Sequence, residues 1–108
     1  MALRELSPTD LKVYLDAAPV KPILLDVRET PEYQHCHIEG SLHIPMNDVP
    51  ARLAELDPKR EIVVICHHGM RSRTVANYLL GQNFQHVINL TGGIDAWASQ
   101  VQPDMPRY

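Results

Sequence analysis

A chain of 108 residues, with 44% hydrophobic and 21% charged residues, is long enough for one globular domain and too short for two ordinary ones. This composition excludes a disordered or fibrous chain, and the net charge of -3 excludes a protein that is basic throughout and coats nucleic acid. Two cysteines, Cys36 and Cys66, are too few for a disulfide scaffold.

The sequence predicts neither a membrane segment nor a secretory leader. The longest unbroken apolar run covers residues 62–66, far short of a membrane span. The first six residues, Met-Ala-Leu-Arg-Glu-Leu, lack the basic stretch and long apolar run of a signal peptide. We therefore expect a cytoplasmic protein with reduced thiols, whose partners include neither a membrane nor nucleic acid.

Helix and strand patterns alternate along the chain. The first helix is expected to begin with Ser7 as its N-cap and Pro8 in its first turn, and to end near Ala18. In chain order there follow a strand at 23–27, a short helix at 30–33 with a capped start at Thr30, a brief strand at 41–45, helical spacing at 49–56, a strand at 61–65, a helix at 72–81, a strand at 86–90 and a last helix from Gly92.

This alternation determines the predicted fold class. Strands that take turns with helices indicate right-handed crossovers and a mostly parallel sheet that is covered on both faces. No internal repeat, low-complexity stretch or linker divides the sequence. We therefore predict a single α/β domain over residues 1–108, with an irregular tail at 101–108 that lies along the surface.

The loop after the strand at 61–65 carries the strongest functional signal. Ligands of open α/β sheets bind beyond the carboxyl ends of the strands, and Cys66 lies at such an end, just before a helix N-terminus. Backbone N–H groups of the loop and the first helical turn favour negative charge on the sulfur, as do Arg71 and Arg73. We expect a nucleophilic thiolate that faces anionic substrates; the alternative is a small buried residue without chemistry.

Four segments, in the same order, resemble the rhodanese family of sulfurtransferases. Residues 66–72, Cys-His-His-Gly-Met-Arg-Ser, are similar to its active-site loop, and residues 26–29 to its Asp-x-Arg stretch. Residues 37–45 resemble its His-Ile-x-Gly-Ser/Ala-x-x-Ile-Pro segment, and residues 92–97 its Gly-Gly-x-x-x-Trp signature. Together the four segments span most of the chain.

The resemblance implies a fold and an activity. The fold is a mostly parallel, five-stranded sheet with helices on both faces, in which residues 3–6 form the edge strand. The activity is transfer of a sulfane sulfur from a small anionic donor such as thiosulfate to cyanide, a thiol or a protein, through a persulfide on catalytic Cys66. No metal or organic cofactor is implied. The expected substrate-binding residues are those of the loop: His67, His68, Gly69, Met70, Arg71 and Ser72.

Asp26 and Arg28 lie at the carboxyl end of the strand at 23–27, on the same side of the sheet as Cys66. One interpretation has them contact the substrate. We favour loop support, in which Asp26 hydrogen-bonds the catalytic loop and Arg28 pairs with a nearby carboxylate. We expect Trp97 to be a packing residue and Met70 to be exposed at the tip of the loop.

Three other functions remain open. Cysteine phosphatases and arsenate reductases of similar layout place one more residue between cysteine and arginine than the four that separate Cys66 from Arg71, so their wider loop is disfavoured here. A non-catalytic rhodanese-like module that binds proteins is disfavoured because Cys66 is present. The third open function is a sulfur carrier, which passes persulfide between proteins and uses thiosulfate poorly.

The run His35-Cys36-His37 invites a metal interpretation. Adjacent residues rarely direct their side chains at one ion, and no second His/Cys pair lies at ligand spacing, so we expect no metal site. Cys36 stands where the family commonly has glycine. We expect an ordinary thiol there rather than a resolving partner that forms a disulfide with Cys66.

Overall fold

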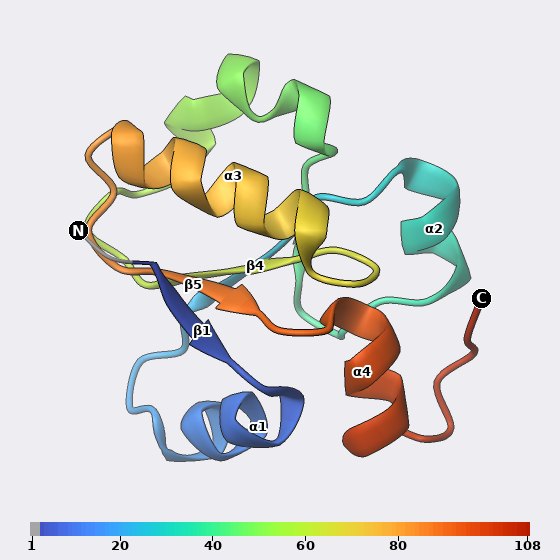
Figure 1. Ribbon diagram of the computed structural model, residues 1–108. Coiled ribbons are helices and arrows are strands. Elements are labelled where there is room, and N and C mark those ends of the chain that lie inside the picture. Colours follow the sequence, from blue (N-terminus) through green and yellow to red (C-terminus); the bar gives the residue numbers. More distant parts are fainter. Residues whose placement is uncertain (1–2) are drawn as a thin grey trace.

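The computed structural model describes residues 3–108, which build a parallel sheet of five strands in the order β1-β5-β4-β2-β3 (Figure 1). The described strands all pair in parallel. Their bounds are β1 Arg4–Leu6, β2 Ile23–Asp26, β3 Leu42–His43, β4 Ile62–Ile65 and β5 Val87–Leu90. The parallel α/β sheet is confirmed, and so is the edge position of β1, which only the family resemblance implied.

Helices cover both faces of the sheet. They are α1 Pro8–Ala17, α2 Thr30–His35, α3 Met70–Gly81 and α4 Gly93–Gln100, with 3-10 segments η1 Met46–Asp48 and η2 Pro50–Glu55. Helix α3 and the 3-10 segments lie on one face, and α1 packs beside α4 on the other (Figure 1). No helix among residues 3–108 has the length and apolar character needed to cross a membrane.

Strand β4 shows how the sequence builds two cores. It lies between β2 and β5 and is buried along its whole length, which explains its continuous run of apolar, mostly β-branched residues. Successive side chains point to opposite faces, so Val64 packs in the core that includes Leu79 of α3, and Val63 in the core that includes Trp97 of α4. Trp97 is 4% exposed, which confirms its packing role.

Two helix starts differ in how well the sequence predicts them. The N-cap of α1 is Ser7, whose side chain accepts a hydrogen bond from the Asp10 backbone N–H, as predicted. For α2 the predicted cap at Thr30 is wrong. Glu29 is the N-cap and forms a capping box with Glu32: the Glu29 backbone N–H donates to Glu32 Oε1 at 3.1 Å, and the Glu29 side chain accepts from the Glu32 backbone N–H. The helix also runs on to His35.

Two other predicted elements are shorter or tighter than expected. The strand at 41–45 contracts to β3, which pairs with β2 at the edge of the sheet and ends two residues before Pro45. Helical spacing at 49–56 corresponds to the 3-10 segment η2, which is kinked at Arg52. Helix α3 begins two residues before the predicted start, because Gly69 adopts φ +99° as its N-cap and turns the chain early.

Candidate active site

Cys66 lies directly after β4, is 1% exposed, and is enclosed by the loop that leads into α3. The Gly69 backbone N–H donates to Cys66 Sγ at 3.0 Å, and Ser72 Oγ lies 3.3 Å from the same sulfur. The first backbone N–H groups of α3 have no partner within the helix, and the helix dipole favours negative charge at that end. This arrangement stabilises an anionic sulfur.

The start of the loop is held by the N-terminus of α4. The Ile94 N–H donates to the Cys66 carbonyl at 2.8 Å, and the Asp95 N–H donates to the His67 carbonyl at 3.1 Å. A Cβ on Gly93 would lie 2.4 Å from each of these two carbonyl oxygens. Glycine is therefore needed at position 93, because a side chain would push the helix away from the loop.

A cleft of about 300 Å³ opens over the sulfur. Its lining comes from α2, the Cys66 loop, the start of α3 and the C-terminal tail: Glu32, Cys66, His67, His68, Met70, Arg71 and Tyr108. Met70 is 74% exposed at the rim, as expected. The structure therefore brings the predicted loop residues together around Cys66 and adds Glu32 and Tyr108, which the sequence did not single out.

Arg71 is paired with a carboxylate rather than free in the cleft. Its two terminal nitrogens donate to Glu32 Oε1 at 2.7 Å and Oε2 at 2.9 Å. Hydrogen bonding to Arg71 lowers the pKa of Glu32 to about 2, and the same pair raises the pKa of Arg71. The positive charge expected from Arg71 is thus largely balanced at the mouth of the cleft.

His67 and His68 have different surroundings. The His67 ring lies 4.1 Å from the Tyr108 ring and 4.0 Å from that of His68, measured between centroids. Burial lowers the pKa of His67, which favours its neutral form, and its buried Nδ1 has no hydrogen-bond partner among the described residues. His68 is exposed, with Nε2 3.8 Å from the Asp95 carboxylate.

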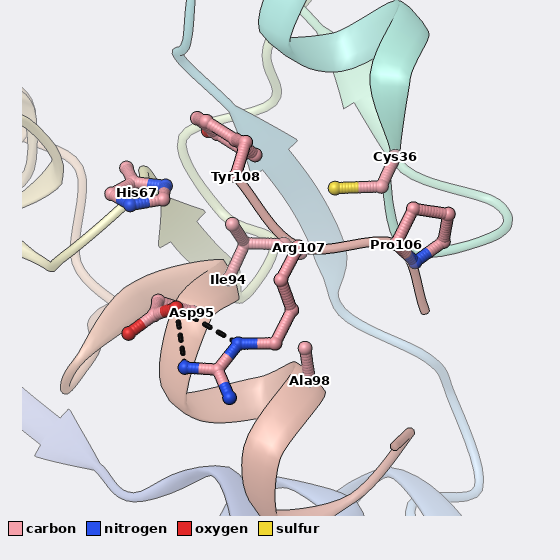
Figure 2. Close-up of a pocket in the computed structure, with 8 residues that line it drawn as sticks. All are labelled: Cys36, His67, Ile94, Asp95, Ala98, Pro106, Arg107 and Tyr108. Carbon is pink, nitrogen blue, oxygen red and sulfur yellow. Dashed lines mark hydrogen bonds and ion pairs between the residues drawn. The ribbon is translucent and has the colours of Figure 1, made fainter. Parts of the chain in front are cut away.

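The C-terminal tail returns past α4 to the site. Figure 2 shows Tyr108 beside His67 above a hollow that Cys36 also lines, with Arg107 hydrogen-bonded to Asp95. The Tyr108 hydroxyl accepts from Arg28 Nη1 and donates to Glu32 Oε2, both at 2.9 Å. The last residue of the chain thereby forms one wall of the cleft.

Asp26 and Arg28 form a fully buried ion pair, with Asp26 Oδ2 2.7 Å from Arg28 Nη2. Within residues 3–108, the hydrogen-bond donors to the Asp26 carboxylate are all groups of Arg28, so the prediction that Asp26 bonds the catalytic loop is wrong. A buried carboxylate is costly unless a cation pairs with it, and Arg28 lies only two residues along the chain from Asp26. The predicted pairing of Arg28 with a carboxylate is correct. Arg28 also donates to the Cys36 carbonyl at 2.6 Å.

The run 35–37 does not converge. His35 Nε2 lies 3.4 Å from the Arg107 carbonyl, whereas His37 Nδ1 lies 2.8 Å from the Tyr33 carbonyl. Cys36 is buried between them, and both cysteines are free thiols. The part of the chain that the structure describes holds no group of three or more His, Cys, Asp or Glu side chains that could bind a metal ion.

Comparisons with known proteins agree with this geometry. The rhodanese-like domain family profile matches residues 7–100. The putative sulfurtransferase YtwF of Bacillus subtilis is 38% identical over 95% of this chain and 98% of its own length. The putative sulfur carrier protein YrkF of the same organism is 42% identical over 73% of this chain, a match that spans only 43% of that relative. The crystal structure of a rhodanese-like domain protein from Staphylococcus aureus superposes with a TM-score of 0.82, at 26% identity, over 88% of this chain and 91% of its own.

Proposed function

This chain belongs to the rhodanese-like family of sulfurtransferases, and from that premise we propose that it moves a sulfane sulfur through a persulfide on Cys66. The observation that carries the proposal is the environment of the sulfur. Cys66 Sγ lies at the floor of an open cleft, within hydrogen-bond distance of the Gly69 N–H and the Ser72 hydroxyl. Such donors stabilise both a thiolate and the anionic outer sulfur of a persulfide.

In the first half of the reaction the thiolate acts as the nucleophile. Its lone pair attacks the sulfane sulfur of a donor such as thiosulfate and forms a new S–S bond. The S–S bond of the donor breaks, and its electron pair leaves with sulfite. Cys66 then carries one extra sulfur, which the loop residues 67–72 surround.

In the second half an acceptor removes this sulfur. The lone pair of cyanide, a thiolate or a cysteine of an acceptor protein attacks the outer sulfur, the S–S bond to Cys66 breaks, and the thiolate returns. Neither half requires a metal or an organic cofactor. Because the cycle needs a free thiol, we place it in the reducing cytoplasm.

The remaining loop residues have supporting roles in this proposal. Arg71 orients an anionic donor when one of its two hydrogen bonds to Glu32 is given up. Neutral His67 lines the path to the sulfur. His68 and Met70 lie at the rim, where an acceptor enters. The four-residue spacing between Cys66 and Arg71 favours a single sulfur over the larger tetrahedral phosphate.

Intact mass after incubation with thiosulfate tests the proposal. We expect a gain of one sulfur atom that cyanide removes, its absence in Cys66→Ser, and its retention in the matched control Cys36→Ser. A Cys66→Ser protein that still transfers sulfur to cyanide would rule out the proposed mechanism.

Three other results would favour a different function or a different donor. Hydrolysis of an aryl phosphate without any sulfur adduct would indicate phosphatase chemistry. Absence of both reactions would favour a protein-interaction module. An adduct formed from a protein persulfide and not from thiosulfate would indicate a sulfur carrier, and would refute only the choice of donor.

A further inference from the structure

Asn89 is a polar residue in an apolar position. It lies in β5, between β1 and β4, and is fully buried. Burial of an amide costs free energy unless every polar atom finds a partner, and Asn is depleted in strands. The position must therefore be explained by what the side chain contacts.

The side-chain amide of Asn89 has three partners. Its Nδ2 donates to Glu5 Oε1 at 3.1 Å and to the Gly69 carbonyl at 3.2 Å, and its Oδ1 accepts from Ser72 Oγ at 2.5 Å. Because both acceptors face Nδ2, a flipped amide would place two oxygens against Oδ1. The orientation of the amide is thus fixed by its surroundings.

Two of these partners, Gly69 and Ser72, are the residues whose donors contact Cys66 Sγ. We propose that Asn89 is a positioning residue for the reactive sulfur, which holds the Gly69 backbone and the Ser72 hydroxyl at the places from which they stabilise anionic Cys66. Asn89 acts through these two groups and does not itself touch the sulfur.

The position of the Ser72 hydroxyl matters because the hydroxyl has two possible acceptors. A hydroxyl has one proton, and Ser72 Oγ lies within hydrogen-bond distance of two acceptors, Asn89 Oδ1 at 2.5 Å and Cys66 Sγ at 3.3 Å. An anionic sulfur attracts this proton more strongly than a thiol does, because hydrogen bonds to charged acceptors are stronger than those to neutral ones. Ser72 Oγ must therefore stay within reach of both acceptors, and Asn89 holds it there.

Glu5 anchors the other side of Asn89. The same Oε1 accepts from Arg73 Nη2 at 3.0 Å and from Thr91 Oγ1 at 3.2 Å. These contacts, with Arg73 the largest contributor, lower the pKa of Glu5, so the carboxylate stays charged at neutral pH. The edge strand β1 is thereby connected to the loop around Cys66 through a single side chain of β5.

The titratable and charged groups around Cys66 lie on two sides. On the cleft side are Glu32, Arg71, His67, His68 and Tyr108; on the Asn89 side are Glu5 and Arg73. Replacement of Asn89 by an apolar residue leaves all of these groups in the chain. A change in the pH dependence of Cys66 then reports on the two donors rather than on a lost charge.

Asn89→Leu tests the proposal, because leucine has a similar size and no hydrogen-bonding atom. We expect the pH midpoint of Cys66 alkylation by iodoacetamide to move upward by about one unit, equivalent to a tenfold weaker preference for the thiolate. Trypsin releases Cys66 within residues 61–71 and Cys36 in a separate peptide, so mass spectrometry follows Cys66 alone. An unchanged or lower midpoint would overturn the proposal.

Two control variants separate positioning from folding. Ile88→Ala, also in β5 and fully buried, should lower the melting temperature but leave the alkylation midpoint where it is in the wild type. Glu5→Gln keeps an acceptor for Asn89 and should shift the midpoint much less than Asn89→Leu. If Ile88→Ala moves the midpoint as far as Asn89→Leu does, the effect is general loosening and the proposal fails.

If Asn89→Leu does not fold, the wild type answers the same question. As Cys66 is deprotonated, the Asn89 side-chain amide resonances should shift with the titration, because the Ser72 hydroxyl that donates to Oδ1 also lies within hydrogen-bond distance of Sγ. Those of Asn47 and Asn77 serve as references, and no movement at Asn89 relative to them would refute the proposal.

The role of Asn89 in catalysis rests on the proposed sulfur transfer, whereas its effect on the Cys66 thiolate does not. In a thiosulfate–cyanide assay Asn89→Leu should lower kcat more than it raises KM for thiosulfate, since its partners Gly69 and Ser72 contact the Cys66 sulfur, whereas Arg71, which orients the donor in the proposed function, keeps its surroundings. Wild-type protein that forms no persulfide would defeat the proposed function, whereas the alkylation midpoint would still test Asn89.

Discussion

Gly93 determines how closely α4 approaches the Cys66 loop. We predict that Gly93→Ala lowers the free energy of unfolding by about 1–3 kcal/mol and slows sulfur transfer, because φ is +62° and the new Cβ meets the Cys66 and His67 carbonyls. Gly81→Ala is the matched control. It lies in α3 with open space around it and should be neutral or stabilising by about 0.5–1 kcal/mol. Urea unfolding measures both, and equal effects of the two substitutions would contradict the close approach.

Glu32 joins α2 to the loop through its pair with Arg71. Its folded pKa of about 2 lies below the ordinary 4.5, so the pair contributes stability that is fully present above pH 4.5 and is lost as the pH falls toward 2. We predict that Glu32→Gln costs up to about 3 kcal/mol at neutral pH, and that the difference from wild type shrinks between pH 4.5 and 2. Urea unfolding across this range measures it, and a difference independent of pH would contradict the assignment.

The C-terminal tail forms one wall of the cleft, and the Tyr108 hydroxyl hydrogen-bonds this wall to Arg28 and Glu32. Tyr108→Phe keeps the ring beside His67 but removes the bonds to Arg28 and Glu32. We predict a loss of about 1–2 kcal/mol, since the buried Arg28 guanidinium loses a partner. Tyr78→Phe on α3 is the control, and we expect a change within about 0.5 kcal/mol there. Chemical denaturation compares the two, and equal losses would mean that the hydroxyl contributes nothing specific.

Strands buried on both faces were predictable from the sequence, because burial on both faces requires a continuous run of apolar residues. The apolar runs at β2, β4 and β5 are of this kind. Strand β1 has only three residues, all at least partly exposed, so no pattern marks it. The Cys66 loop was predictable because its residues are contiguous. Its pairing with Glu32 was not, since the partners lie 39 residues apart and only the crossover between β2 and β4 brings them together.

The whole molecule has two cores that share one sheet. Leu79 belongs to the core under α3, and the single tryptophan, Trp97, to the opposite core. We predict that Leu79→Ala lowers stability by about 2–5 kcal/mol and shifts the denaturation midpoints of tryptophan fluorescence and far-ultraviolet circular dichroism together, because the continuous sheet makes the cores one cooperative unit. Val13→Ala, on the exposed surface, is the control with little expected effect. Separate midpoints for the two probes would show that the cores unfold independently.

The two outermost strands of the sheet, β1 and β3, have three and two residues, while the strands between them have four. An edge strand exposes unpaired backbone groups on which another chain can add, and a short edge gives it little to bind. The order of the strands thus places the longest pairings around Cys66 and leaves the weakest templates at the rims. The same topology therefore places Cys66 at the end of a central strand and leaves only short strands at both edges of the sheet.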